Sequence, residues 1–315
     1  MPKYLITGAS GQLGPELAAA LRDKHGPDSV VCTDIRPPPS DSPGYAIIMS
    51  GPFEYLDVTN YDQFAKITLD HKVTCIIHFA ALLSAIGENN PALCLRVNMR
   101  GTENALEIAK NLKVQCFIPS SIAAFGPTTP REGTLDVTIQ RPETLYGVSK
   151  VYTELLGEWY NRKFGVDFRC LRYPGIISWK TLPGGGTTDW SCASYFACIE
   201  SGKYECFVRE DTKMPLMYID DCVNGTIQLL EADSKLLKQR TYNLVATSFS
   251  PKEQAEAIRK FYPHFVQTYK PDVRQKYADS WPMDLDDSNA RRDWGWKPKF
   301  DLLTMTQDIL SHLKK

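Results

Sequence analysis

Short apolar runs alternate with longer amphipathic stretches over the first half of the chain. We expect the apolar runs to form strands at residues 3–7, 29–34, 53–57, 73–79, 114–120 and 167–173. The stretches between them predict helices at residues 12–24, 61–69, 91–112 and 146–164. Repeated strand–helix–strand units are typical of a parallel sheet with helices on both faces. The pattern therefore predicts an α/β fold with a doubly wound parallel sheet.

The pattern changes after Tyr173. Four further helices are predicted, at residues 189–201, 220–232, 251–261 and 302–314, but only two strands, at residues 204–208 and 241–245. A glycine-rich loop at residues 182–186 and other irregular connections separate these elements. We therefore expect two domains. Residues 1–173 hold the sheet, with segments of the second half returning to it, and residues 174–315 form most of a smaller, discontinuous lobe.

Composition and charge exclude several classes of protein. The 315 residues carry 36 Lys and Arg against 37 Asp and Glu, and the net charge of −1 argues against a nucleic-acid partner. No run approaches the roughly 18 apolar residues of a membrane span, so we expect no membrane partner. The five histidines show no metal-binding spacing, and no metal is expected.

Nine scattered cysteines lack any Cys-x-x-Cys pair, so we expect free thiols in a reducing compartment. The start of the chain shows no secretory signal. The expected location is therefore soluble and intracellular. It is the cytoplasm, or the mitochondrial matrix if a presequence has been removed or is atypical.

Three glycines lie between the first predicted strand and the first predicted helix. Gly8, Gly11 and Gly14 follow a G-x-x-G-x-x-G spacing, with Gln12 and Leu13 between the last two. Glycines let the backbone approach a pyrophosphate, whose charge is stabilised by the free N–H groups at a helix N-terminus. The motif predicts a dinucleotide-binding (Rossmann) domain in the first half of the chain.

Acidic and small residues at the ends of the following strands fit the rest of a dinucleotide. Asp34 lies twenty residues after Gly14, where a carboxylate accepts hydrogen bonds from the adenosine ribose and repels a 2′-phosphate. We therefore expect NAD rather than NADP, although Arg36 leaves NADP as an alternative. Further contacts with the cofactor are expected at the next strand ends, from Asp57, Val58, Phe79, Ala80 and Ala81.

A Tyr-x-x-x-Lys pair opens the long helix predicted at residues 146–164. Tyr146 and Lys150 share one helix face because they are four residues apart. A phenol in water ionises near pH 10, and a neighbouring ammonium favours the ionised form. Ser121 ends the fifth predicted strand, where its hydroxyl could hold a substrate oxygen. These three residues form the predicted catalytic group.

Together these motifs resemble the extended short-chain dehydrogenase/reductase superfamily, which includes the nucleotide-sugar epimerases. The resemblance spans essentially the whole chain and implies an NAD-dependent enzyme. It implies that Tyr146 is the general base, that Lys150 binds the nicotinamide ribose, and that Ser121 orients the substrate. The resemblance also implies roles for Asn98, which would help to position the lysine, and for a segment facing the nicotinamide that contains Tyr173, Pro174 and Ile176.

A narrower resemblance is to the short-chain L-threonine 3-dehydrogenases. It rests on residues 182–189, 217–222, 281–282, 286–288 and 293–296. Members of that family oxidise the 3-hydroxyl of L-threonine with NAD and form 2-amino-3-oxobutanoate. The resemblance implies the same step of threonine catabolism, with a substrate-binding lobe in residues 174–315. It also implies a homodimer built by helices 91–112 and 146–164.

The residues of the second half suit a small zwitterionic substrate. A carboxylate needs N–H and O–H donors, which Gly186, Thr187 and Thr188 supply. Ser84, just after the fourth strand, fits the substrate pocket of the same family. Trp281 is expected either to close the pocket over the threonine methyl group or to pack in the core of the small lobe.

The predicted reaction moves the hydroxyl proton to Tyr146 and a hydride from C3 of threonine to NAD. Two alternatives stay open. A nucleotide-sugar epimerase or dehydratase would need a long cationic groove for a sugar diphosphate, for which Lys180 and Lys203 are candidates. A non-catalytic NAD-sensing regulator could dispense with the Tyr–Lys pair, which is intact here.

Overall fold

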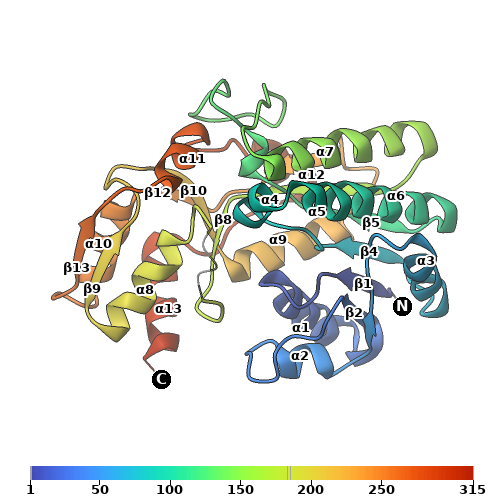
Figure 1. Cartoon of the computed structure of the whole chain (residues 1–315), viewed down its shortest axis with the longest axis horizontal. Helices are drawn as coiled ribbons and strands as arrows, with labels where there is room; N and C mark the ends of the chain where they lie inside the picture. The colour runs from blue at the N-terminus through green and yellow to red at the C-terminus, as the bar shows by residue number, and fades with distance from the viewer. Residues whose placement is uncertain (1, 183, 185, 315) are drawn as a thin grey trace. The chain divides into compact units, whose positions relative to one another are not determined.

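A computed structural model of the chain describes residues 2–182, 184 and 186–314 (Figure 1). The chain divides into two compact units. Unit 1 comprises residues 1–124, 143–172 and 226–242, and unit 2 comprises residues 125–142, 173–225 and 243–315. Residues 125–142, expected in the first domain, thus belong to unit 2. Their backbone is paired with a distant segment there, since the N–H of Met283 donates to the carbonyl of Arg131 at 2.8 Å.

Unit 1 is built on a sheet of eight strands. The order is β11-β7-β5-β4-β1-β2-β3, and β6 pairs with β7. The pairs that join β3 to β7 through β1 are parallel. The strands are β1 (Tyr4–Thr7), β2 (Val30–Asp34), β3 (Phe53–Tyr55), β4 (Cys75–His78), β5 (Gln115–Phe117), β6 (Ser120–Ser121), β7 (Phe168–Tyr173) and β11 (Thr241–Asn243). The strand order reverses at β1, and open α/β sheets bind ligands at the carboxyl ends beside such a point.

Helices cover both faces of this sheet. On one face α3, α6 and α7 pack against one another, and α1 lies against β1 and β2 on the other (Figure 1). The helices of unit 1 are α1 (Leu13–His25), α2 (Tyr45–Met49), α3 (Tyr61–Asp70), α4 (Ser84–Asn89), α5 (Pro91–Cys94), α6 (Gly101–Leu112) and α7 (Leu145–Phe164), and α9 (Ile219–Glu231) ends in this unit.

The core explains why the strands are continuously apolar. Leu5, Phe64, Ile76 and Leu106 belong to one fully buried cluster between the sheet and its α3–α6–α7 layer. Ile6 points to the opposite face of β1 and is also fully buried. Because both faces are covered, neither side of a central strand is polar. The predicted fold class is confirmed.

Two predicted elements of unit 1 are interrupted. The helix expected at residues 91–112 consists of α5, a π-helical segment (Leu95–Arg100) and α6. Asn98 lies in the π-helical segment and exchanges two hydrogen bonds with the backbone of Leu82, at 2.8 and 3.0 Å. The strand expected at residues 114–120 stops at Phe117, because Pro119 has no N–H to donate to a neighbouring strand.

Unit 2 contains two smaller sheets, one of order β12-β10-β8 and one that pairs β13 with β9. Its strands are β8 (Gly175–Ile177), β9 (Lys203–Cys206), β10 (Met214–Tyr218), β12 (Thr247–Phe249) and β13 (Val266–Tyr269). Its helices are α8 (Trp190–Glu200), α10 (Pro251–Arg259), α11 (Arg274–Ser280), α12 (Ser288–Trp294) and α13 (Leu302–Leu313), with the start of α9. Four of the five strands were missed, because runs of three to five residues carry little periodic signal.

All nine cysteines are free and buried, as expected. Burial raises the pKa of Cys32 to about 11, so this thiol stays protonated at neutral pH. Within the described ranges, no helix is both long enough and apolar enough to cross a membrane.

Candidate nucleotide-binding and catalytic site

The glycine loop packs closely against the carboxyl ends of β1 and β4. Gly8 has a φ of +65°, and a Cβ there would lie 2.6 Å from the backbone nitrogen of Ala80. A Cβ on Gly14 would lie 2.1 Å from the carbonyl oxygen of Ala9. A Cβ on Gly11 would meet the carbonyl oxygen of Gly8 at 3.4 Å and no other described atom within 4 Å. The loop thus needs Gly8 and Gly14 for its own fold, whereas Gly11 leaves its backbone open to a ligand.

Helix α1 starts directly after this loop. Among the described residues, no side chain makes a capping hydrogen bond at its N-cap position, Gln12. The first N–H groups, from Leu13 onward, therefore need another acceptor, and the helix dipole favours an anionic one. The pyrophosphate of a dinucleotide has that chemistry.

Asp34 joins the end of β2 to the glycine loop. Its Oδ2 accepts a hydrogen bond from the N–H of Ser10 at 3.0 Å, and its Oδ1 accepts one from the N–H of Ile35 at 2.8 Å. The hydroxyl of Ser10 donates to the carbonyl of Arg36 at 3.0 Å. A carboxylate oxygen accepts more than one hydrogen bond, so Asp34 can also accept from a ribose.

The end of β3 forms a local turn. The strand stops at Tyr55, and the exposed Asp57 accepts hydrogen bonds through Oδ1 from the N–H and the hydroxyl of Thr59, at 2.9 and 2.8 Å. Val58 is buried, and its carbonyl accepts a hydrogen bond from Asn104 at 2.8 Å. Both of these hydrogen bonds to Asp57 use Oδ1, so Oδ2 could accept a hydrogen bond from the adenine amino group of a dinucleotide.

His78 ends β4, and sequence reasoning missed it. Its Nδ1 is hydrogen-bonded to the hydroxyl of Thr7 at 2.8 Å, and the N–H of Ala80 donates to the same hydroxyl at 3.4 Å. Burial, and then the charge of Lys150, lower the pKa of His78 to about 3. The imidazole is therefore neutral near Lys150. The segment that follows His78, with Phe79, Ala80 and Ala81, is half-buried beside the glycine loop.

The Tyr–Lys pair lies in the first turns of α7. Thr144 caps this helix by accepting a hydrogen bond from the N–H of Gly147 at 3.1 Å. The Nζ of Lys150 lies 5.3 Å from the ring centroid of Tyr146 and donates to the carbonyl of Pro119 at 2.7 Å. Lys150 is buried, whereas Tyr146 is half-buried. The ammonium is thus held between the phenol ring and the end of β5.

Ser121 belongs to a segment that packs against the same helix. Both β6 and the short 3₁₀ segment after it (Ile122–Ala124) contact α7. The hydroxyl of Ser121 accepts a hydrogen bond from the N–H of Ala123 at 3.2 Å, and the side chain is half-buried. The hydroxyl proton of Ser121 is thus free of that contact and available to a substrate oxygen.

Asn98 reaches α7 through Ser149. Its Nδ2 donates to the hydroxyl of Ser149 at 3.1 Å, and that hydroxyl donates to the carbonyl of Tyr146 at 2.7 Å. Among the described residues, no hydrogen bond joins Asn98 to Lys150. The contact of Asn98 with α7 is therefore made in the first turn of the helix, and its role in positioning the lysine stays a prediction.

Two buried charged residues extend this arrangement, and sequence reasoning missed both. Glu154 lies one turn after Lys150 and accepts two hydrogen bonds from Arg172, at 2.9 and 2.7 Å. It also accepts a hydrogen bond from the hydroxyl of Ser120. The signal for Glu154 was its spacing, because it continues the four-residue repeat of Tyr146 and Lys150.

Unit 2 brings part of the glycine-rich loop to β8. The N–H of Gly186 donates to Oδ2 of Asp189 at 2.8 Å. A Cβ on Gly175 would lie 2.8 Å from the Cβ of Thr188, so the loop packs directly on the strand. Thr187 is buried. The other predicted residues of this region lie where β7 ends and β8 begins. Tyr173 and Pro174 are buried, and Ile176 is half-buried.

Trp281 and Ser84 are the two remaining substrate candidates. Trp281 is buried in unit 2, and its carbonyl accepts a hydrogen bond from Arg131 at 3.0 Å. Its burial fits the expectation of core packing. Ser84 begins α4 in unit 1, and its side chain lies outside the part of the molecule that the structure describes.

A parallel sheet with a glycine loop after β1 and a Tyr–Lys pair on α7 defines a dinucleotide-dependent enzyme. The chain belongs to the NAD dependent epimerase/dehydratase family, whose model matches residues 4–244. The superfamily inferred from the motifs is thereby confirmed, and NAD is the cofactor of the family.

Individual relatives and solved structures show which members of the family this chain is similar to. The mitochondrial L-threonine 3-dehydrogenase of Bos taurus is 48% identical over 310 residues, which cover 98% of this chain and 82% of the relative. The crystal structure of L-threonine dehydrogenase from Phytophthora infestans is 47% identical with a TM-score of 0.94, and it covers 99% of both chains. That of L-threonine dehydrogenase from Clostridium difficile is 45% identical with a TM-score of 0.96, covering 100% of this chain and 98% of the other. The similarity to L-threonine 3-dehydrogenases is confirmed over nearly the whole chain.

A more distant structure shares the fold alone. The nucleoside-diphosphate-sugar epimerase from Agrobacterium tumefaciens is 20% identical with a TM-score of 0.86, and it covers 98% of this chain and 94% of the other.

Proposed function

We propose that this chain is an NAD-dependent oxidoreductase that converts the 3-hydroxyl of L-threonine to the ketone of 2-amino-3-oxobutanoate. The observation that carries the proposal is the pairing of Lys150 with Tyr146, whose ring centroid is 5.3 Å from the lysine Nζ. The similarity to proteins named L-threonine 3-dehydrogenase, over 98% of this chain, supports the choice of substrate.

Tyr146 is the proposed proton acceptor. The nearby Lys150 ammonium favours a phenolate, and its bond to the Pro119 carbonyl keeps it in place. The hydroxyl proton of threonine passes to the phenolate oxygen, and the hydroxyl of Ser121 keeps the substrate oxygen within reach. NAD, when bound, accepts the hydride that leaves C3 of threonine.

The proposed cofactor contacts follow the chain along the carboxyl edge of the sheet. The loop from Gly8 to Gly14, with Gln12 and Leu13, binds the pyrophosphate, and Asp34 accepts hydrogen bonds from the adenosine ribose. Lys150 binds the nicotinamide ribose. The other proposed contacts are Asp57, Val58, Phe79, Ala80, Ala81, Asn98, Tyr146, Tyr173, Pro174 and Ile176.

The proposed donors to the threonine carboxylate are the N–H and O–H groups of Gly186, Thr187 and Thr188, with Ser84 as a further polar contact.

In this proposal residues 1–173 are mainly the NAD-binding part and residues 174–315 mainly the substrate-binding part. We place the protein in a reducing compartment, the cytoplasm or the mitochondrial matrix, since relatives named as mitochondrial exist.

A homodimer is part of the proposal. Val148, Leu155 and Trp159 lie on one side of α7 and are 42%, 57% and 44% exposed. An apolar stripe of this kind on a long helix fits a second copy of the same helix. Light scattering of Leu155→Glu should then give half the mass of the unaltered protein, and equal masses would contradict a dimer through this face.

The test is NADH formation followed by absorbance, with L-threonine, allo-threonine and serine compared side by side. L-Threonine should give the highest kcat/KM. A UDP-sugar that is epimerised or dehydrated without net NADH, while threonine stays inert, would favour the nucleotide-sugar alternative. An NAD-binding protein that turns over none of these compounds would favour the regulator.

A further inference from the structure

The buried face of α7 continues one turn beyond the Tyr–Lys pair. Tyr146, Lys150 and Glu154 follow one another at a spacing of four residues and so share this face. The side chains of Glu154 and Arg172 are 2% and 5% exposed. Arg172 donates from Nε to Oε1 at 2.9 Å and from Nη2 to Oε2 at 2.7 Å. A two-point contact of this kind fixes both the distance and the orientation of the partners.

Residues 119–121 are attached to α7 at two consecutive turns. The carbonyl of Pro119 accepts a hydrogen bond from Lys150 at 2.7 Å, and the hydroxyl of Ser120 donates to Glu154. Ser121, the proposed substrate-orienting residue, is next in the chain. The position of Ser121 relative to α7 therefore depends on the Lys150–Pro119 and Ser120–Glu154 hydrogen bonds.

The spacing also creates a competitor for the lysine. A Lys and a Glu at positions i and i+4 of a helix are neighbours and can form an ion pair. Here the carboxylate of Glu154 forms its ion pair with Arg172 instead. Among the described residues, no carboxylate lies at ion-pair distance from Lys150. The lysine is thereby left on the carbonyl of Pro119, beside the ring of Tyr146.

We propose that Arg172 is a positioning residue, which occupies Glu154 so that this carboxylate holds Ser120 and does not draw Lys150 away from Tyr146. The inference rests on the proposed function, because it assigns Lys150 a role in ionising Tyr146. Arg172 lies on β7 and is not among the residues proposed to contact the substrate or the cofactor.

Several elements around Lys150 contribute titratable or charged groups that lie near it or near Glu154. They are Tyr146 and Glu154 on α7, His78 on β4, Cys94 on α5, and Cys170 with Arg172 on β7. Burial raises the pKa of both thiols, and His78 has a pKa of about 3. Between pH 6 and 9, a change in the pH profile should therefore report the Tyr146–Lys150 pair.

The experiment compares Arg172→Met with the double variant Glu154→Gln/Arg172→Met in steady-state oxidation of threonine from pH 6 to 9. In Arg172→Met, Glu154 should capture Lys150. We expect kcat/KM at pH 7 to fall at least tenfold, with the profile moved about one unit to higher pH. Removing the carboxylate as well should move the profile back and recover most of the loss. Arg172→Lys, with a one-point contact, should show a smaller shift in the same direction if Arg172→Met folds poorly.

Arg169→Met is the matched control. Arg169 is also a buried, ion-paired arginine of β7, with a side chain 4% exposed, but it lies at the other end of the strand. Its loss should lower the unfolding temperature and leave the pH profile of the folded enzyme unchanged. Equal losses in the single and double Arg172 variants, at every pH, would mean that the pair is structural and would overturn the inference.

A crystal structure of Arg172→Met tests the same inference without turnover. We expect the Nζ of Lys150 within about 4 Å of the Glu154 carboxylate. If Lys150 stays on Pro119, the inference is wrong whatever the substrate is. If Lys150 moves but the unaltered enzyme makes no NADH from threonine, the proposed function fails and the positioning role stands.

Discussion

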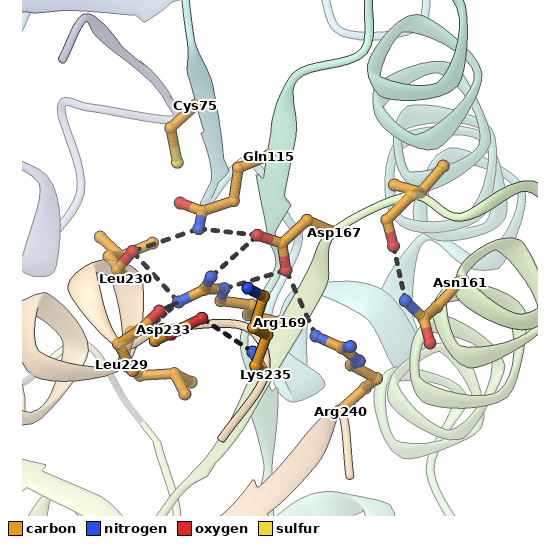
Figure 2. A network of polar contacts seen from close by, with 12 residues as sticks. Cys75, Gln115, Asn161, Asp167, Arg169, Leu229, Leu230, Asp233, Lys235 and Arg240 are labelled. Carbon is orange, nitrogen blue, oxygen red and sulfur yellow. Dashed lines mark hydrogen bonds and ion pairs between the residues drawn. The ribbon is translucent and has the colours of Figure 1, made fainter. Parts of the chain in front are cut away.

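β7 carries a buried arginine near each of its ends, and the two side chains meet very different surroundings. Arg169, near the amino end, pairs with Asp167 at 2.8 Å (Figure 2). It also donates to the carbonyl of Ala232 at 2.7 Å. Arg172, near the carboxyl end, pairs with Glu154 at 2.7 Å. The chemistry of the two contacts is alike, so the difference lies in what each arginine holds.

At the amino edge the network closes the end of a helix. Figure 2 shows Arg169 directed at the last carbonyls of α9, with Gln115 and Arg240 completing the contacts of Asp167. The last turn of a helix leaves carbonyls without partners, and a buried guanidinium can satisfy several at once. This network therefore attaches residues 226–242 to β5 and β7 within unit 1, and none of its side chains is among the proposed site residues.

At the carboxyl edge the contacts of Arg172 lead to Tyr146, Lys150 and Ser121. Ligands of open α/β sheets bind at that edge. We therefore expect the place of a buried arginine along β7 to decide whether its substitution changes stability or activity.

The largest effect is expected from Arg169→Met. Removing the guanidinium leaves the carbonyls at the end of α9 without this donor, which costs about 1–3 kcal/mol of unfolding free energy for each buried carbonyl left unsatisfied. Asp167 contributes less, because its side chain is 32% exposed and keeps Arg240 as a partner. Chemical denaturation should show this loss, while kcat per folded molecule stays unchanged. A fall in kcat with an unchanged free energy of unfolding would contradict the view that the contacts of Arg169 are only structural.

A smaller effect, on binding, is expected from Asp34→Ala at the carboxyl edge. The loss of charge-assisted hydrogen bonds to the ribose should raise the dissociation constant for NAD about 10- to 100-fold and reduce the preference over NADP. Fluorescence titration with both nucleotides measures this. Asp57→Ala is the comparison variant. It should affect affinity less, because Oδ1 of Asp57 is bound to Thr59 and only Oδ2 is proposed to contact the cofactor, whereas Asp34 is proposed to bind the ribose hydroxyls.

The smallest effect concerns the pH dependence of stability. His78 has a pKa of about 3 in the folded protein, lowered by burial and by Lys150, whereas an unfolded histidine has a pKa near 6.5. Below pH 6.5 the unfolded state binds a proton that the folded state does not. The free energy of unfolding should therefore fall by about 1.4 kcal/mol per pH unit from this group alone.

His78→Asn keeps a hydrogen-bonding partner for Thr7 and removes this titration. Denaturation at pH 6, 5 and 4 should give a slope that is shallower than that of the unaltered protein by nearly the same amount. Equal slopes would mean that His78 is protonated inside the fold, and Lys150 would then have a charged neighbour.

The glycine loop, the Tyr–Lys pair and most strands of unit 1 could be predicted from the sequence, because each depends on residues that are close together in the chain. The glycine loop and the Tyr–Lys pair are short motifs whose spacing alone sets their geometry. The strands of unit 1 could be predicted because burial on both faces makes them continuously apolar, as Leu5 and Ile6 show.

The contacts between distant segments could not be predicted in this way. Nothing in the sequence of β7 shows that Arg169 reaches the carbonyls of α9 or that Arg172 reaches Glu154 on α7, because these partners lie on other elements. The π-helical segment around Asn98 was missed, since one extra residue per turn hardly changes a helical pattern. The short strands of unit 2 were missed because three to five residues give too little periodicity.

The central claim is that Tyr146 accepts the proton of the threonine hydroxyl. Single-turnover NADH formation by Tyr146→Phe, with NAD binding measured in parallel, tests it most directly. We predict that turnover falls by at least about a thousandfold while the dissociation constant for NAD stays within a few-fold of the unaltered protein. A variant that oxidises threonine at a near-normal rate would contradict the account.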